Sequence, residues 1–144
     1  MSENKYIVRG IPANFIEHFW HFAVPYVKRA LDHAHGEVSP DDIKRKCLER
    51  DAQLWLVYSS DNRIVGAGTT EIVVYPQMKV CRIITLAGSG FDEWVNIADQ
   101  TIQMWAIEQG CKALEALTRK GFIPKLQEIG YKYKYATLHK KLVE

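Results

Sequence analysis

The sequence predicts an α/β (α+β) fold: a mixed, mostly antiparallel sheet flanked by helices, with one βαβ crossover around Gly88-Ser89-Gly90. The run Val80–Ala87 is rich in β-branched residues and too short for a typical helix, so it predicts a buried strand. The glycines end this run, and apolar residues then recur at three- and four-residue spacing as far as Gly110, which indicates one face of a helix. The short apolar segment Lys112–Leu117 follows. Two strands joined by a helix in this way lie parallel in one sheet.

The composition is typical of a globular protein. A chain of 144 residues, 47% hydrophobic and 25% charged, predicts one domain spanning residues 1–144 with a core of its own. The formal charge of +2 is too small to argue for nucleic acid. No apolar run has the length of a signal peptide or a membrane span, so we expect a cytoplasmic protein with no membrane partner.

Cysteines and histidines are the residues that could hold a metal. The three cysteines are widely spaced within apolar patterns, so we expect reduced core residues and neither a disulfide nor a metal site. His18 and His21 lie three apart on one predicted helix face, with His33 and His35 further along, but no cysteine joins them. We therefore expect surface or half-buried histidines and no metal.

The first part of the chain predicts a strand and two helices. Lys5–Arg9 alternates like a strand, and apolar residues at helical spacing follow from Pro12 to Ala30. Pro25 should kink or divide this helix. Ser39-Pro40 begins a second helix, because a serine cap, a proline at the first helical position and acids in the first turn all favour a helix start.

The middle of the chain predicts two strands before the crossover. Gln53–Ser59 is apolar on both faces, which is typical of a central strand. Ile64–Tyr75 is a long second strand, in which Gly66 and Gly68 indicate a bulge or close backbone packing. Pro76–Lys79 turns the chain into the strand that precedes the glycines.

The end of the chain predicts a short helix and one or two closing strands. Phe122–Ile129 is the helix, and Gly130 ends it. Tyr131–Leu142 alternates aromatic and basic residues, which is typical of an edge strand whose lysines face water. The same pattern occurs in segments that bind nucleic acid, although the edge-strand interpretation is favoured.

The glycine turn is the candidate binding site. A strand that runs through glycines into a helix exposes backbone N–H groups at the helix start, and phosphate is a common ligand there. Ser89 or Gly90 can start the helix, and Asp92 and Glu93 suit its positive end. The alternative for Gly88 and Gly90 is a purely steric role at a tight turn.

The element order and three motifs resemble the GCN5-related N-acetyltransferase (GNAT) superfamily. Its fourth strand ends in a Gln/Arg-x-x-Gly-x-Gly/Ala loop, and Thr85–Gly90 is the matching run here. Trp105–Cys111 resembles the end of the family's next helix, and Leu126–Tyr131 resembles its final helix-turn-strand. The chain is most similar to the small, divergent GNAT-like proteins of bacteriophages and prophages.

This resemblance implies an acyl-CoA-dependent N-acetyltransferase acting on a small-molecule or protein amine. Acetyl-CoA would bind through its pyrophosphate to the loop amides and through its pantetheine arm between the splayed parallel strands. Glu71 is the candidate base, and Tyr131 or Tyr133 is the candidate acid. The cofactor-binding candidates are Leu86, Gly88, Ser89, Gly90 and Arg119, with Lys120 beside it. Glu71 could instead be a solvated or cross-strand-paired carboxylate.

Three departures from the family pattern favour a second hypothesis. Thr85 stands at the Gln/Arg position, Asp92 and Glu93 place negative charge where a pyrophosphate would lie, and Leu126 replaces the usual tyrosine. The alternative is therefore a catalytically inactive GNAT-fold protein that binds a protein partner, such as a component of a phage virion or a phage-host complex.

Overall fold

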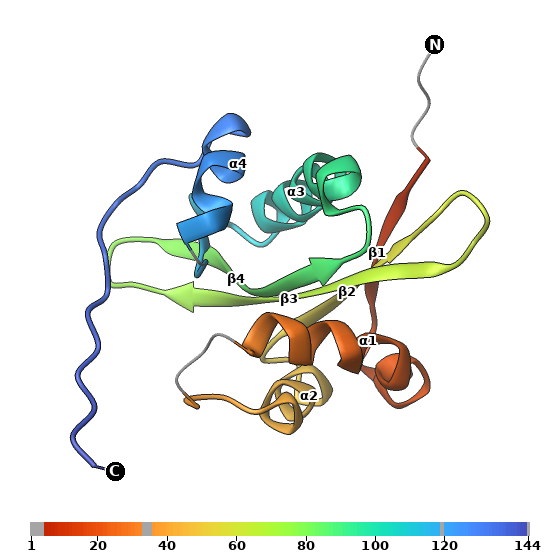
Figure 1. Cartoon of the computed structure of the whole chain (residues 1–144), viewed down its shortest axis with the longest axis horizontal. Helices are drawn as coiled ribbons and strands as arrows, with labels where there is room; N and C mark the ends of the chain where they lie inside the picture. The colour runs from red at the N-terminus through yellow and green to blue at the C-terminus, as the bar shows by residue number, and fades with distance from the viewer. Residues whose placement is uncertain (1–4, 33–35, 119, 144) are drawn as a thin grey trace.

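In the computed structural model, which describes residues 5–32, 36–118 and 120–143, five strands form one sheet in the order β1-β2-β3-β4-β5 (Figure 1). The first four strands are antiparallel neighbours, and β5 is parallel to β4. The strands are β1 Ile7–Ile11, β2 Gln53–Tyr58, β3 Ile64–Val74, β4 Lys79–Gly88 and β5 Ala113–Ala116. The predicted mixed, mostly antiparallel sheet with one crossover is confirmed, and the first strand lies two residues later than expected.

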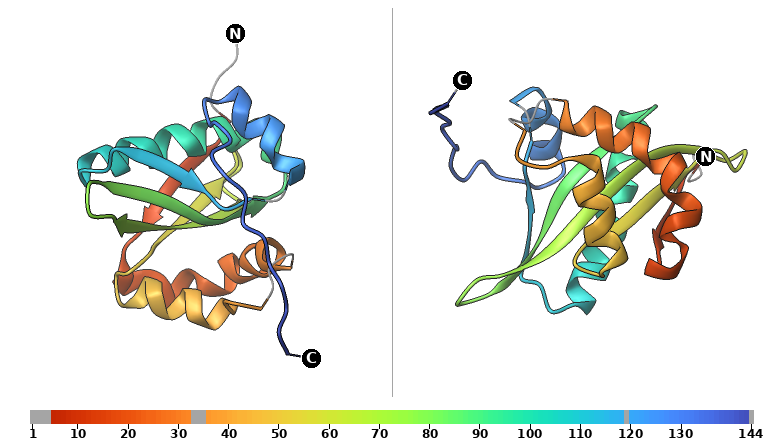
Figure 2. Two further views of the ribbon diagram at one scale, coloured as in Figure 1. Left: turned by 90° about the vertical axis from the view of Figure 1, so that its left-hand side faces the viewer. Right: turned by 90° about the horizontal axis from the view of Figure 1, so that it is seen from below.

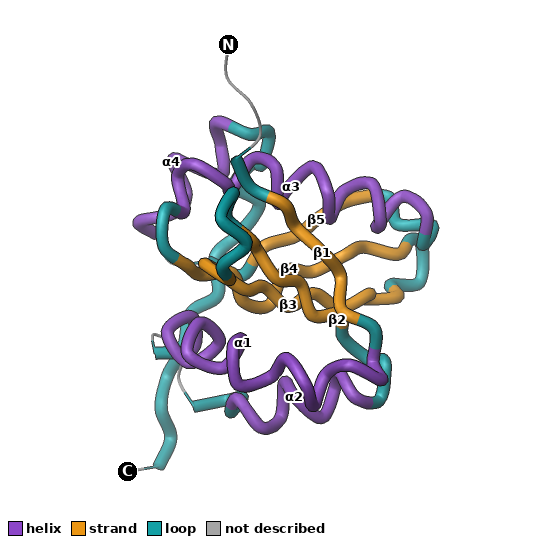
Figure 3. Tube along the Cα trace, turned by 90° about the vertical axis from the view of Figure 1, so that its right-hand side faces the viewer, coloured by secondary structure: helices purple, strands orange, loops and turns teal. Residues whose placement is uncertain are grey.

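Helices cover both faces of the sheet. The helices α1 and α2 lie against one face, and α3 and α4 lie on the other, so the molecule has three layers (Figures 1 and 3). Short 3-10 turns precede α1 and α4. The bounds are α1 Ile16–Leu31, α2 Pro40–Leu48, α3 Phe91–Glu108 and α4 Ile123–Glu128.

The helix α1 is not divided at Pro25. It continues as one helix on both sides of the proline, although proline removes one backbone hydrogen bond. Its apolar stripe explains why, because Trp20, Ala23 and Val27 are buried before and after the proline. Packing of this stripe on the sheet offsets the loss of the bond.

The helix α2 begins where the sequence predicts. The Ser39 hydroxyl accepts a hydrogen bond from the Asp42 N–H at 3.2 Å, and the Asp42 carboxylate accepts one from the Ser39 N–H at 2.9 Å. This reciprocal pair satisfies two backbone donors that the first turn would otherwise leave without partners.

The core lies on both sides of the central strand β2. Leu54 and Leu56 are fully buried against α1 and α2, whereas Trp55 and Val57 are buried on the α3 side. Burial on both faces explains why this strand is apolar at almost every position, as the sequence predicts.

Glycines in β3 allow close packing against α3 and against β4. A Cβ on Gly66 would lie 2.7 Å from the Trp94 ring, and a Cβ on Gly68 would lie 2.6 Å from the Leu86 side chain. A break in the β3–β4 register follows at Thr69/Thr70. The close packing and the irregularity predicted for this strand are both present.

The predicted closing strands do not form. Residues 131–143 carry neither helix nor strand, and this segment leads away from α4 and past the sheet toward the side of α1 and α2 (Figure 2). Alternation predicts which side chains share a face, but a strand also needs a neighbouring backbone to pair with. The exposed apolar side chains of this segment are Tyr133, Tyr135, Leu138, Leu142 and Val143.

Candidate functional site

The parallel strands β4 and β5 pair over a short length and then part. Their register runs from Val80 opposite Ala113 to Ile83 opposite Ala116, whereas β4 continues to Gly88. The β3–β4 pairing skips Ile84, which lies between the residues that face Thr70 and Thr69, and such a bulge bends a strand. Beyond Ile83, the side of β4 that faced β5 therefore presents backbone groups that pair with no strand of the described chain. We call this side, from Ile84 to Gly88, the free edge of β4.

The turn after β4 is built by glycine conformation. Gly90 has φ +69°, in the left-handed region, and is followed directly by the first residue of α3. The Ser89 N–H donates to the Val65 carbonyl at 2.8 Å, so this amide is used within the protein. The left-handed conformation requires glycine or a residue such as asparagine at position 90.

Gly88 has a steric role. A Cβ there would lie 2.4 Å from the Val65 carbonyl oxygen, 2.5 Å from Gly66 Cα and 2.8 Å from the Trp94 ring. The indole of Trp94 is fully buried and donates its N–H to the Ser89 carbonyl at 2.7 Å. The turn is thus held by Trp94, and packing alone accounts for the glycine at position 88.

A carboxylate and a phenol occupy the start of α3. The Tyr6 hydroxyl donates a hydrogen bond to Glu93 Oε1 at 2.8 Å, and this bond raises the pKa of Tyr6. The same hydroxyl lies 3.2 Å from where a Cβ on Gly90 would be. The backbone N–H groups of the helix start therefore face a negative charge from the protein itself. Because Tyr6 and Glu93 lie 87 positions apart, no local pattern in the sequence predicts this contact.

One lysine reaches the first turn of α3. Lys125 Nζ on α4 lies 3.9 Å from the Asp92 carboxylate and 3.7 Å from Glu128. Its spacing on a short helix does not mark it in the sequence. Lys125 supplies a positive charge beside the turn. The sequence predicted Arg119 and Lys120 for cofactor binding instead. Arg119 lies outside the described residues, and Lys120 is exposed in the 3-10 turn before α4.

Two other residues of the predicted loop pack their side chains inside the protein. Thr85 is buried, and its hydroxyl lies 2.7 Å from that of Thr69. Leu86 packs with Val57 and Trp94 under α3. Only the backbone of Leu86 belongs to the free edge of β4.

Glu71 belongs to a charged network on the α2 side of the sheet. Its carboxylate lies 2.8 Å from Lys46 Nζ and 3.8 Å from the Arg82 guanidinium. Arg82 lies 3.5 Å from Glu115 and donates a hydrogen bond to the Tyr75 hydroxyl at 3.1 Å. These contacts match the cross-strand-paired alternative that the sequence left open for Glu71.

The network lies next to the point where β4 and β5 part. Arg82 is opposite Glu115 in the register, one step before the last pair, Ile83 and Ala116. The Arg82 Nε is buried and has no hydrogen-bond partner among the described residues. The carboxylates of Glu71 and Glu115 are less than a quarter exposed. Two carboxylates, an arginine and a phenol thus border the closed end of the strand divergence.

Tyr131 is half-buried on the opposite, α3 side. Its hydroxyl donates a hydrogen bond to Asp99 Oδ1 at 2.7 Å. Burial, together with this bond, raises the pKa of Tyr131, and burial also raises the pKa of Asp99 against the opposing effect of the bond. The phenol therefore stays protonated and is committed to Asp99. Its backbone N–H donates to the carbonyl of Leu126 at 3.0 Å, and the other candidate acid, Tyr133, is 58% exposed.

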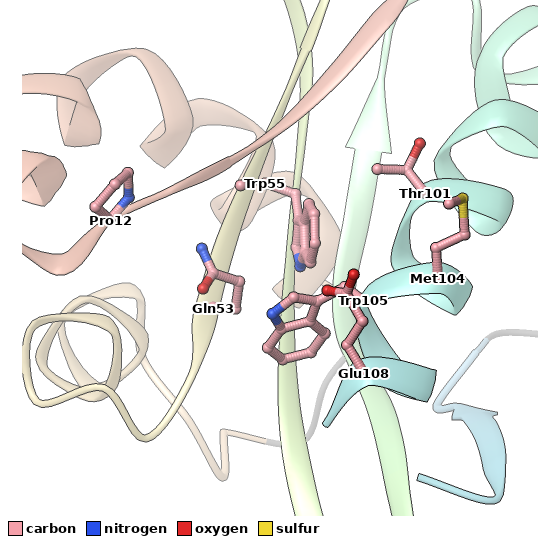
Figure 4. A pocket seen from close by; sticks show the side chains of 8 residues that line it. Pro12, Gln53, Trp55, Thr101, Met104, Trp105 and Glu108 are labelled. Atoms are coloured by element: carbon pink, nitrogen blue, oxygen red, sulfur yellow. The ribbon is translucent and has the colours of Figure 1, made fainter. Parts of the chain in front are cut away.

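Two surface clefts lie away from the glycine turn. One, of about 530 Å³, includes Glu71, Asp51 and Arg50 among its lining residues. The other, of about 430 Å³, is lined by Trp55 and Trp105 and is drawn in Figure 4. Glu71 is thus the one predicted catalytic residue that borders either of these two clefts.

The described residues show neither a membrane-spanning helix nor a metal cluster. No helix in these ranges is both long and apolar enough to cross a bilayer. No group of three or more potential ligands comes together in the same ranges. His18 and His21 contact the aromatic rings of Phe19 and Phe22, whereas His33 and His35 lie outside the described residues.

Solved structures of acetyltransferases share this architecture. An aminoglycoside acetyltransferase from an uncultured soil metagenomic sample, in complex with trehalose, is similar with a TM-score of 0.72 and 10% identity, covering 99% of this chain and 98% of that one. Glucosamine-6-phosphate N-acetyltransferase from Arabidopsis thaliana is similar with a TM-score of 0.66 and 12% identity, and the match covers 96% of this chain and 99% of that one. A GNAT family acetyltransferase from Staphylococcus aureus has a TM-score of 0.58 and 16% identity, with the same coverage of 96% of this chain and 99% of that one. No protein-family model matches the chain, and no curated protein does either.

At these identities the likeness concerns the fold. The predicted GNAT-like architecture is confirmed over nearly the whole chain, including the crossover from β4 through α3 to β5. The chain therefore has the GNAT fold.

Proposed function

We propose that this protein transfers an acetyl group from acetyl-CoA to an amine. The single observation that carries the proposal is the divergence of β4 from β5 after Ile83 and Ala116, which leaves one edge of β4 without a neighbouring strand, among the described residues, as far as Gly88. An extended arm that contains amide groups can pair with such an edge as a strand would. The free edge leads directly to the start of α3, where phosphates are commonly bound.

The residues present fit the arm of acetyl-CoA better than its phosphates. The free edge of β4 offers backbone donors and acceptors, and Lys125 offers a cation beside the turn. Glu93, held at the turn by Tyr6, opposes a pyrophosphate at the same place. Binding would therefore need Glu93 to move aside or the phosphates to lie toward Lys125.

The chemistry requires a base for the amine. When bound, acetyl-CoA would supply a thioester: as the amine nitrogen bonds to its carbonyl carbon, the carbon–sulfur bond would break, and the CoA thiolate would leave and take up a proton from water. Glu71 is the proposed base, because its carboxylate borders a cleft and lies near the point where the strands part. Lys46 and Arg82 hold its side chain in place through ion pairs at 2.8 Å and 3.8 Å. Tyr131 is a poor acid here, because its hydroxyl is committed to Asp99 and its pKa is raised.

The acceptor is the open part of the proposal. The acetyltransferases of similar fold include one that acts on aminoglycosides and one that acts on glucosamine 6-phosphate. Amino sugars are therefore the first acceptors to test.

The direct test is product formation. Purified protein, acetyl-CoA and a panel of aminoglycosides, amino sugars and lysine peptides are incubated, and acetylated products are identified by mass spectrometry. Glu71→Gln should lower turnover about 100-fold, as removal of a general base does, with acetyl-CoA affinity unchanged. The matched control Glu49→Gln removes an exposed carboxylate at the end of α2 and should leave turnover unchanged. Equal turnover in Glu71→Gln and wild type would remove Glu71 from the mechanism.

A second candidate function is the binding of a protein partner, without acetyl transfer. It is favoured by the Tyr6–Glu93 contact at the helix start. In that case acetyl-CoA would not bind, and Glu93→Gln would restore measurable binding by removing the negative charge. If the wild type already binds acetyl-CoA, and Glu93→Gln binds it about three- to tenfold more tightly, the result supports the transferase instead.

A further inference from the structure

A cleft at the other end of α3 has the features of a ligand site. It is formed by the end of β1, the start of β2 and the last turns of α3, and it encloses about 430 Å³ (Figure 4). We call it the indole cleft, because Trp55 and Trp105 both line it. Glu108, at its far end, lies about 25 Å along the helix from Phe91, given the rise of an α-helix. The indole cleft is thus separate from the glycine turn.

The two indole rings are held in a fixed arrangement. Their centroids lie 5.4 Å apart, with their planes at 80°. Trp55 is 4% exposed and donates its N–H to the Thr70 hydroxyl at 2.9 Å, so its ring cannot turn freely. Gly10 keeps the adjoining wall open, because a Cβ there would lie 3.3 Å from the Trp55 ring and from the Gln53 amide nitrogen. The cleft therefore presents preformed aromatic surface.

The polar groups of the indole cleft favour a cation. Among the described residues that line it, Glu108 is the only one that carries a charge. The Gln53 amide nitrogen donates to the carbonyls of Ile11 and Leu54, so its oxygen, an acceptor, is the end of the amide that remains for a ligand. A carboxylate, an amide oxygen and the half-buried ring of Trp105 all attract positive charge.

The apolar part of the lining favours an organic ion over a metal. Met104 is 68% exposed at the rim, and Pro12 lies opposite it. Thioether and indole surfaces gain little from a hydrated metal ion, whereas they contact alkyl groups well. We infer that the indole cleft binds an organic ammonium ion, with its alkyl groups against Trp105 and Met104 and its charge toward Glu108.

The test uses choline and its uncharged carbon isostere, 3,3-dimethylbutan-1-ol. These two probes have nearly the same shape and differ in charge. Each is titrated into the full chain, and the indole N–H signals are followed by NMR. Choline at millimolar concentration should shift the signals of Trp105 and Trp55, whereas the indoles of Trp94 and Trp20, which do not line the cleft, should not respond. The alcohol should bind at least about fivefold more weakly, which corresponds to one exposed cation–π contact.

Two variants distinguish choline binding in the indole cleft from nonspecific attraction to surface carboxylates. Glu108→Gln, on the exposed end of α3, should weaken choline binding about fivefold. Trp105→Leu removes one of the two signals and should abolish the response of the other, that of Trp55. Glu128→Gln is the matched control, because it removes an exposed carboxylate on α4. An unchanged Trp94 signal shows that each variant is folded. No shift of Trp105 with choline, equal binding of the alcohol, or equal losses in Glu108→Gln and Glu128→Gln would each overturn the inference.

Discussion

The glycine at position 88 is explained by its neighbours rather than by a ligand. A side chain there would meet the Val65 carbonyl, Gly66 and the Trp94 ring at less than 3 Å. The sequence left the binding and the steric interpretations open, and the structure gives the steric one a physical cause. The residue that identifies the turn in the sequence is therefore needed for folding, whether or not acetyl-CoA binds.

The first prediction concerns Gly88→Ala. The added methyl group would force the β3–β4 backbones or Trp94 apart, which should lower the free energy of unfolding by about 3 kcal/mol. Urea denaturation followed by tryptophan fluorescence measures this difference. Gly121→Ala is the control, because a Cβ there meets nothing within 4 Å and should change the stability by less than about 0.5 kcal/mol.

The second prediction concerns the pH dependence that Tyr131 creates. Its pKa is raised in the folded state by burial and by Asp99, so the folded chain keeps a proton that the unfolded chain loses above about pH 10. The stability that this group contributes is present below the unfolded pKa and falls as the pH rises above it. Tyr131→Phe should be less stable than wild type at neutral pH, with a difference that shrinks from about pH 10 upward.

Thermal unfolding at several pH values tests this expectation. Tyr133→Phe is the control, because the Tyr133 side chain is 58% exposed and should give no such trend. A stability difference between Tyr131→Phe and wild type that stays constant up to strongly alkaline pH would contradict the account.

Among the elements, those built by local chemistry were predicted best. The start of α2 follows from Ser39, Pro40 and Asp42, which are adjacent in sequence and form the cap in the structure. β2 follows from its continuous apolar run. These features need no knowledge of distant residues, and therefore one sequence is enough to predict them.

Elements that depend on distant partners were predicted less well. Residues 131–143 alternate like a strand but have no strand beside them, and α1 continues through Pro25 because it packs on the sheet. The same limit applies to the site. Tyr6 meets Glu93 and Lys46 meets Glu71 across 87 and 25 positions, so neither pair leaves a local pattern.

The third prediction concerns the C-terminal segment. A chain that ends after Tyr131 loses a segment whose described residues, 132–143, are all exposed, and it should keep its free energy of unfolding within about 0.5 kcal/mol. A chain that ends after Gly130 also loses the half-buried ring of Tyr131 and its bond to Asp99. We expect this second truncation to cost about 3 kcal/mol. Equal stability of the two truncations, measured by urea denaturation, would contradict the assigned role of Tyr131.

At the scale of the molecule, the fold and the site give different degrees of support for acetyl transfer. The parting of β4 and β5 and the left-handed turn before α3 support the acyl-CoA arm that we propose. The carboxylate of Glu93 at the same turn opposes the phosphates. The affinity for acetyl-CoA measures whether pairing of the arm with β4 outweighs the repulsion between Glu93 and the phosphates.

Calorimetric titration with acetyl-CoA answers it, using wild type and two variants at position 90. Asparagine and aspartate both tolerate the left-handed conformation of Gly90, so Gly90→Asn and Gly90→Asp differ mainly in charge. The account predicts that wild type and Gly90→Asn bind acetyl-CoA with micromolar affinity and that Gly90→Asp binds at least about tenfold more weakly. No heat with wild type at millimolar acetyl-CoA, or equal affinities of the two variants, would contradict an acyl-CoA site at this turn.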